Sequence, residues 1–215
     1  MDVMTFTDCT LLILKGLLYT ALITLLSLPL GTLLGAAVYA MTLSRRRWVR
    51  EVARWYRYIV RGTPLIVLLL AVYYVVLGGG GGLLAAVIAF SLNFSNFACA
   101  DIGSSIDSVG RDQIDAGRAL GLSNWQNLRY VVAPQAVRYA LPTYKFQAVG
   151  MVKSTSVVGY VAMQDLTQAT MAIRQGTGQM LIPLLVATAI YFILAWLLSK
   201  MLDTIVKHSL KNDNR

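Results

Sequence analysis

The chain has 215 residues, of which 57% are hydrophobic and only 13% are charged. A soluble domain is usually about 45–50% apolar and about 25% charged, so this composition argues against a soluble enzyme, a disordered tail or a disulfide-stapled secreted module. The length fits a single domain, residues 1–215, and the remaining class is an integral membrane protein. The meaning of the formal net charge of +9 depends on where the basic residues lie relative to the membrane.

Long uncharged stretches, taken in chain order, predict where the chain crosses the membrane, because a spanning helix needs about 20 mostly apolar residues. In the first stretch, Pro29, Gly31 and Gly35 predict a kink and close packing against another helix. The glycines at 78–82 interrupt the next stretch, and we expect the chain to reverse there. The sequence thus predicts an all-α membrane protein with about five spans, at residues 17–41, 64–77, 83–100, 139–161 and 180–202.

The fourth span is the most polar of the five, and the third also carries polar side chains. Polar groups are costly in lipid, so they face protein or water and mark a functional path by default. The alternative is that they only pair one helix with another. The candidate path residues are Asn93, Asn96, Lys153, Ser154 and Thr155.

Basic residues set the orientation, because Lys and Arg gather on the cytoplasmic side of membrane proteins. If the N-terminus is outside, nearly all of them fall inside, and only Lys15 and Arg174 lie outside. We therefore expect an external N-terminus and a cytoplasmic C-terminus. The positive charge is then a signal of topology, and nucleic-acid binding is not expected.

The first cytoplasmic segment, Arg45 to Arg61, predicts an amphipathic helix. Its arginines recur every three or four residues, and so do the apolar residues Trp48, Trp55 and Ile59. Such a helix lies in the headgroup layer with its arginines near anionic lipid. We interpret it as an interfacial anchor for the next span. The alternative is a specific lipid or partner site.

The second cytoplasmic segment, residues 104–135, is too polar to span the membrane and too long for a simple turn. It predicts a short helix at 112–120 that ends at Gly121, and a second at 124–130 that is capped by Ser123. Pro134 is expected to close the segment. Two short helices beneath a membrane domain suggest a docking element. The same pattern is equally consistent with a loop that has only a structural role.

This segment resembles the cytoplasmic loop of ABC-importer permeases. Asp115-Ala116-Gly117 stands at the E-A-A position of their signature, Gly121 follows at the expected spacing, and Val131 and Pro134 complete the match. Four further stretches are similar to the polar amino-acid uptake family, which includes histidine, glutamine, glutamate and arginine permeases. These stretches are Arg61-Gly-Thr-Pro-Leu, Ala119-Leu-Gly-Leu-Ser, Pro134-Gln-Ala-Val-Arg and Lys153-Ser-Thr-Ser-Val followed by Asp165-Leu166.

The chain departs from the family pattern at several positions. Asp115 replaces Glu, and Gly117 replaces Ala, a change expected to loosen the helix by about 1 kcal/mol. Upstream, Ala100 and Gly103 stand where the family usually has Glu and Arg. Whether the neighbouring Asp101 takes over either role is left open by the sequence.

The resemblance implies the ABC importer type I permease fold in a bacterial inner membrane, with this chain forming the translocation path for a polar amino acid. The implied partners are two ABC ATPase subunits, a second permease subunit (the same chain or a paralogue) and an extracytoplasmic solute-binding protein that docks near Gln164 to Gln179. ATP and Mg would be held by the ATPase. The ATPase-coupling residues implied here are Asp112, Asp115, Ala116, Gly117, Leu120 and Gly121.

The chain itself is not expected to be an enzyme or to hold a metal. It has no P-loop, and with one histidine, His208, it offers neither a zinc site nor a Ser-His-Asp triad. Two alternatives to the amino-acid importer stay open. The same architecture could import another small polar solute, such as an opine or a polyamine, or the chain could be an ion-driven secondary transporter. The absence of a detectable internal repeat argues against the latter.

Overall fold

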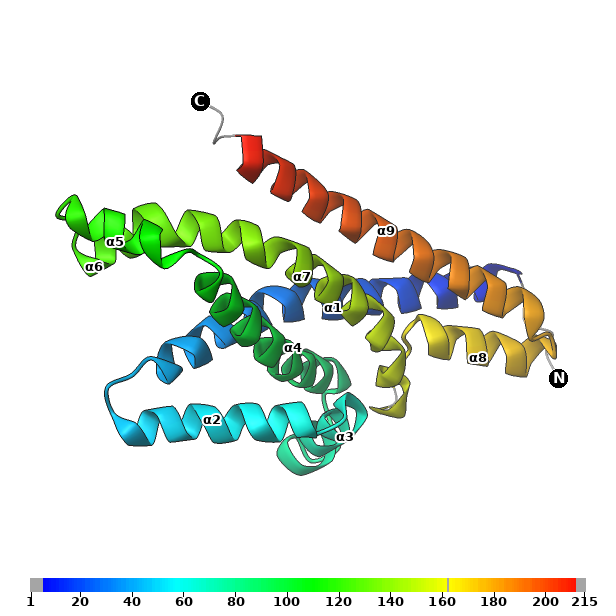
Figure 1. Cartoon of the computed structure of the whole chain (residues 1–215). Helices are drawn as coiled ribbons and strands as arrows, with labels where there is room; N and C mark the ends of the chain where they lie inside the picture. Colours follow the sequence, from blue (N-terminus) through cyan, green and yellow to red (C-terminus); the bar gives the residue numbers. More distant parts are fainter. Residues whose placement is uncertain (1–5, 162, 212–215) are drawn as a thin grey trace.

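The computed structural model describes residues 6–161 and 163–211, and every regular element in this part of the chain is a helix (Figure 1). The helices follow one another with short connections. In chain order they are α1 (Phe6–Thr42), α2 (Arg47–Gly62), α3 (Leu65–Leu70), α4 (Gly82–Asp107), α5 (Arg111–Ala119), α6 (Asn124–Asn127), α7 (Ala133–Ser154), α8 (Leu166–Thr177) and α9 (Leu181–Lys211). A π-helical turn, Ala71–Val76, extends α3, and another, Leu128–Val132, joins α6 to α7. A 3-10 turn, Thr155–Val161, follows α7.

Three helices are long and apolar enough to cross a membrane alone: α1, α4 and the Leu181–Thr204 part of α9. They correspond to the spans predicted at 17–41, 83–100 and 180–202, with wider bounds. The span predicted at 64–77 is a helical segment in the structure, Leu65–Val76, that is too short to cross a membrane alone. It forms α3 and its π-helical turn, and it pairs with α2 across a bend of 110°.

The helix in place of the predicted fourth span, 139–161, has different bounds. α7 begins at Ala133 and ends at Ser154, and the 3-10 turn occupies the remainder. Pro134 was expected to close the preceding segment. It lies instead in the first turn of α7. A proline is tolerated there because the first backbone N–H groups of a helix have no partner within the helix.

The predicted cytoplasmic segment, 104–135, is also shorter than expected at its start, because α4 continues to Asp107. The hydroxyls of Ser105 and Ser108 donate to the carbonyls of Asp101 and Ser104, at 2.5 Å and 2.7 Å. These serines satisfy their hydrogen bonds along the helix, so their polarity does not end it.

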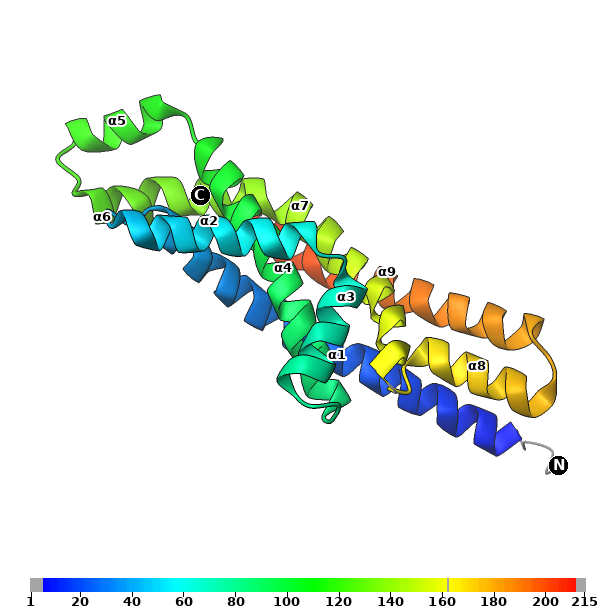
Figure 2. The same ribbon diagram turned by 90° about the horizontal axis from the view of Figure 1, so that it is seen from below.

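The two ends of the molecule carry different elements. Figures 1 and 2 both place α5 and α6 at one end, and α8 with the start of α1 at the other. The chain between α1 and α2, which contains the first of the arginines, lies toward the α5–α6 end. α1 packs along α4, α4 along α7, and α7 along α9.

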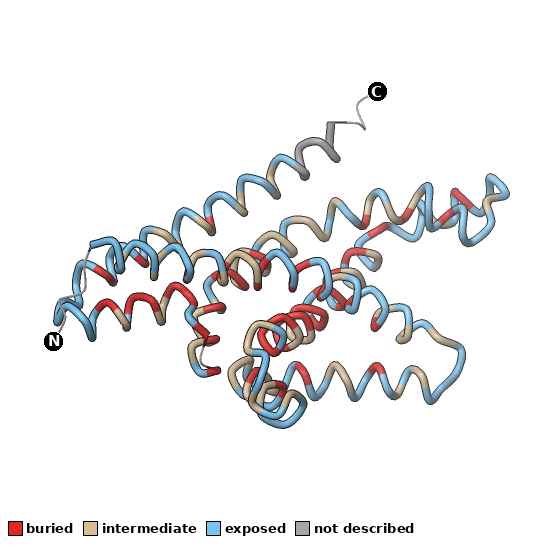
Figure 3. The backbone as a smooth tube through the Cα atoms, turned by 180° about the vertical axis from the view of Figure 1, so that it is seen from behind, coloured by how far each residue is buried: buried red, intermediate tan, exposed pale blue. Residues whose placement is uncertain are grey.

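The core is centred on α4, while α9 is largely exposed (Figure 3). Phe90 and Phe94 of α4 are almost fully buried. The close packing predicted at Gly31 and Gly35 is confirmed. A Cβ on Gly31 would lie 2.9 Å from the Phe94 Cβ, and a Cβ on Gly35 would lie 2.6 Å from the Ala98 Cβ.

The chain reversal predicted at the glycine run is also confirmed. Gly78, Gly79 and Gly81 all have positive φ, which glycine adopts at no steric cost. This turn connects the π-helical end of α3 to the start of α4. Residues 78–81 have no close neighbour outside the turn and the adjoining helices, whereas a Cβ on Gly82 would lie 2.8 Å from the Met163 side chain.

Candidate translocation path and coupling element

The two short helices α5 and α6 form a compact projecting unit. Their connection turns at Gly121, whose φ of 78° favours glycine, and the Gly121 N–H donates to the Arg118 carbonyl at 2.9 Å. Ser123 caps α6 in a reciprocal box with Gln126. The helix predicted at 112–120 is therefore confirmed within one residue at each end. The turn at Gly121 and the cap at Ser123 are confirmed as well.

A contact between α5 and α6 explains why glycine stands at position 117. The Asn127 side chain is buried against Gly117, and its Nδ2 donates to the Ile114 carbonyl at 2.7 Å. A Cβ at position 117 would lie 2.6 Å from the Asn127 Oδ1. The glycine that was expected only to loosen the helix thus makes room for a side chain that joins the two helices. Asn127 was missed by the sequence reasoning, and its spacing from Gly117 gives no signal of the contact.

The outer face of α5 is open in this single chain. Asp112, Asp115 and Leu120 are all exposed, Leu120 to 82%. The Asp115 carboxylate contacts only its neighbour Arg118, at 3.0 Å, among the residues described. The opposite face is held by Ile114, which packs against the cluster formed by Val109, Val132 and Ala136. α5 is thus fixed on one side and presents a charged and apolar surface on the other.

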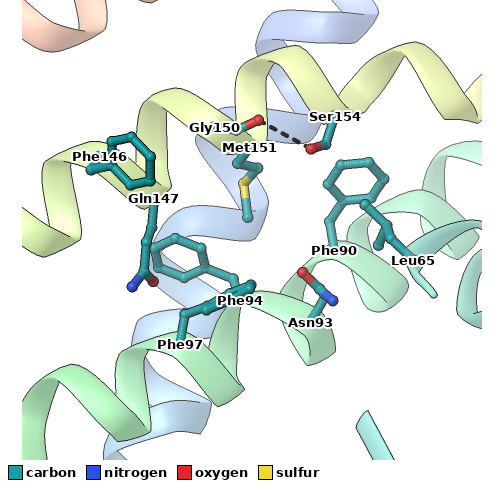
Figure 4. A pocket seen from close by; sticks show the side chains of 10 residues that line it. All are labelled: Leu65, Phe90, Asn93, Phe94, Phe97, Phe146, Gln147, Gly150, Met151 and Ser154. Atoms are coloured by element: carbon teal, nitrogen blue, oxygen red, sulfur yellow. Dashed lines mark hydrogen bonds between the residues drawn. The ribbon is translucent and has the colours of Figure 1, made fainter. Parts of the chain in front are cut away.

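Between α4 and α7 lies a cavity of about 280 Å³ (Figure 4). Its walls are mainly apolar and include four phenylalanines, and its polar groups are Asn93 from α4 and Gln147 and Ser154 from α7. The Ser154 hydroxyl donates to the Gly150 carbonyl at 3.1 Å. An apolar cavity with a few converging polar groups is the usual form of a small-molecule site. Two predicted path residues, Asn93 and Ser154, meet here.

The other predicted path residues lie elsewhere. Asn96 lines a second cavity, between α4 and α2. Lys153 lines a groove between α7 and α9. Thr155 is fully buried, and its hydroxyl donates to the Val152 carbonyl at 2.8 Å. Neighbouring residues on a helix point about 100° apart, so a run such as 153–155 is not confined to one face.

A polar pair beside the α4–α7 cavity was not assigned from the sequence. Gln147 Nε2 donates to Asp101 Oδ1 at 3.2 Å, and Asp101 is buried, with 6% of its surface exposed. Asp101 Oδ2 and Gln147 Oε1 have no hydrogen-bond partner among the described residues. Buried polar atoms normally have partners, so these two enclosed oxygens are exceptions within the described part of the chain. The one indication of this pair in the sequence was Asp101 itself, an acidic residue next to the position where the family usually has Glu.

Lys145, in contrast, pairs two helices, since its Nζ forms an ion pair with Asp203 Oδ1 of α9 at 2.5 Å.

Asp165 is a buried acid with a structural role. It caps α8 by accepting from the backbone N–H groups of Thr167 and Gln168, and it accepts from the Tyr191 hydroxyl. Burial raises the pKa of the Asp165 carboxyl, and these hydrogen bonds offset part of that increase.

The sequence of residues 13–212 matches the model of a protein family described as the binding-protein-dependent transport system inner membrane component. The chain belongs to this family. It is a multi-pass membrane permease of the ABC-importer class, as the motifs around Asp115 indicated. In the residues that the structure describes, no group of acidic, histidine or cysteine side chains is arranged to hold a metal.

Individual relatives cover most of the chain. An L-cystine transport system permease protein of Bacillus subtilis is 32% identical over 86% of this chain and 80% of its own length. A nopaline transport system permease protein of Agrobacterium fabrum is 29% identical over 85% and 81%. The crystal structure of an amino acid ABC transporter with histidines superposes with a TM-score of 0.86 at 29% identity, covering 97% of this chain and 99% of that one.

Proposed function

We propose that this chain forms the translocation path of an ATP-driven importer for a polar amino acid. The observation that carries the proposal is the combination of a small polar and aromatic cavity between α4 and α7 with an exposed coupling unit, α5–α6, at one end of the bundle. The names of the relatives, which include cystine and nopaline permeases, support amino acids and related solutes as the substrate class.

The polar groups of the cavity suit a zwitterionic substrate. Side-chain amides such as those of Asn93 and Gln147 offer both donors and acceptors, so they can bind a carboxylate and an ammonium group.

In the proposed complex, α5 docks on an ATPase subunit through Asp112, Asp115 and Leu120, and the turn at Gly121 sets its angle. Two ATPase subunits and a second permease complete the transporter, and a solute-binding protein delivers the substrate at the α8 end. The N-terminus is then external and the C-terminus cytoplasmic. The placement of α5–α6 and the arginines after α1 toward one end supports this orientation.

The coupling role is tested by charge reversal on α5. Asp115→Arg should abolish ATP-driven uptake and reduce co-purification of the ATPase, because a partner surface that accepts a carboxylate rejects a guanidinium. Asp107→Arg, at an exposed acid that ends α4, is the matched control and should leave co-purification intact. Normal uptake by the Asp115→Arg variant would contradict the docking role.

The path is tested by two asparagines on the same helix. Asn93→Ala should raise the apparent Km for uptake, whereas Asn96→Ala, in the second cavity, should not. The substrate panel should contain histidine, glutamine, cystine, nopaline and a polyamine. Equal effects of the two substitutions on apparent Km would remove the α4–α7 cavity from the path. Uptake that persists without ATP would support the ion-driven alternative.

A further inference from the structure

A basic cavity of about 370 Å³ lies where α2, the end of α1 and α4 meet. Four arginines of α2 line it, together with Thr42, Tyr58 and Asn96. These arginines, at positions 50, 54, 57 and 61, recur at helical spacing, so one face of α2 supplies all of them. The cavity shares no lining residue with the α4–α7 cavity.

The arginines are only partly neutralised by the chain. Glu51 is the single acidic residue of α2, and both of its carboxylate oxygens accept from Arg54, at 2.9 Å. Arg50 donates to the carbonyls of Ser44 and Arg45. Neither Arg57 nor Arg61 forms an ion pair with any described residue, and the buried Nε of Arg57 has no acceptor.

Asn96 adds a neutral polar group to this site from α4. Asn96 is 7% exposed, lines the cavity and forms no side-chain hydrogen bond with the described residues. Buried polar groups normally have partners, and here the buried Nε of Arg57 lacks one while the amide of Asn96 lines the same cavity. An anion with several acceptor oxygens would satisfy both.

The opposite face of α2 indicates where such an anion would come from. Trp48, Trp55 and Ile59 are between 60% and 64% exposed, so α2 carries an apolar surface opposite its basic face, the arrangement of a helix that lies in the headgroup layer of a membrane. Several guanidinium groups favour a phosphate, because each offers a planar fork of donors.

We infer that this cavity binds a phosphate group and that an anionic lipid headgroup supplies it. The apolar face of α2 would place the helix at the level of the headgroups, where the arginines on its other face can contact a lipid phosphate. Inorganic phosphate offers the same chemistry without the acyl chains, so the experiment must separate the two sources.

The test compares lipid retention by the full-length chain in nanodiscs that contain phosphatidylglycerol and phosphatidylcholine, measured by native mass spectrometry. We expect the wild type to retain phosphatidylglycerol selectively. The double variant Arg57→Gln, Arg61→Gln should retain it about thirtyfold more weakly, the sum of two arginine contacts near a membrane surface. The matched control, Arg45→Gln with Arg46→Gln, removes the same charge outside the cavity and should retain phosphatidylglycerol more strongly than the cavity variant.

Two further measurements keep the result interpretable. Thermal unfolding in detergent should show stabilisation by phosphatidylglycerol and not by millimolar inorganic phosphate, and the cavity variant should lose this stabilisation while keeping its lipid-free Tm. Stabilisation by inorganic phosphate to the same extent would overturn the lipid source. Equal lipid retention by the cavity and control variants would overturn the site, as would equal retention of phosphatidylcholine by the wild type.

Discussion

The α1–α4 crossing and the α5–α6 unit are held together by different means. At the crossing, Gly31 and Gly35 bring two long helices into backbone contact, and the fit depends on the absence of side-chain volume. In the α5–α6 unit, Asn127 and the capping residues join two short helices through a few hydrogen bonds. The comparison indicates a packed scaffold that carries a small, polar and locally stabilised unit.

The largest expected effect comes from adding volume at the crossing. Gly35→Leu would force its Cβ against Ala98 and against the Ser95 carbonyl, which a Cβ would approach to 2.7 Å. Overpacking of this kind costs about 1–3 kcal/mol and occasionally more, so we expect a clear loss of thermal stability in detergent. Gly150→Ala, at a helical glycine with nothing within 4 Å, is the control. Similar Tm values for the two variants would contradict tight packing at Gly35.

A smaller and local effect is expected in the coupling unit. Gly117→Ala gains about 1 kcal/mol of helix propensity, but the new Cβ displaces the buried side chain of Asn127. We expect faster hydrogen exchange in residues 111–127 and little change in the global Tm. In an Asn127→Ala background the same substitution should slow exchange instead, because the two positions are coupled. Additive effects would show that the contact has no energetic role.

The buried acid Asp165 should make stability depend on pH. The pKa of Asp165 is higher in the folded protein than in the unfolded chain, so the folded state binds the proton more tightly. The contribution of Asp165 to the free energy of unfolding therefore decreases as pH rises through the folded pKa. Asp165→Asn keeps a side-chain oxygen for the α8 cap and removes the charge. Its Tm should match or exceed the wild-type Tm at pH 7, and the difference should shrink as pH falls toward 4. A variant less stable at pH 7 than at pH 4 relative to the wild type would contradict the raised pKa.

The smallest expected effect concerns the exposed pair between Asp115 and Arg118. Pairs of this kind contribute at most about 1 kcal/mol, so Arg118→Gln should leave the Tm unchanged. If ATP-driven uptake nevertheless falls, the guanidinium acts on the partner and not on the fold. A clear drop in Tm would show that α5 depends on this ion pair.

Local signals were sufficient for much of the fold. Charge-free stretches identified α1, α4 and α9, and the roles of Gly35, Gly121 and Ser123 followed from backbone geometry and capping chemistry. The end of α4 was missed, because serines that bond back along the helix look like loop residues in a sequence. Tertiary contacts were missed for a related reason. The pairing of Asp101 with Gln147 and the separation of Asn93 from Asn96 depend on how α4 meets α7 and α2.

The glycine turn between α3 and α4 has a practical consequence. A Cβ at Gly78 would meet nothing within 4 Å, and the three positive-φ residues carry no side chains. Exposed tips of this kind tolerate inserted sequence well, because no packed contact has to be broken. A short epitope placed there would therefore report, by its accessibility to antibody in intact cells, which face of the membrane the turn occupies, without disturbing either helix that it connects.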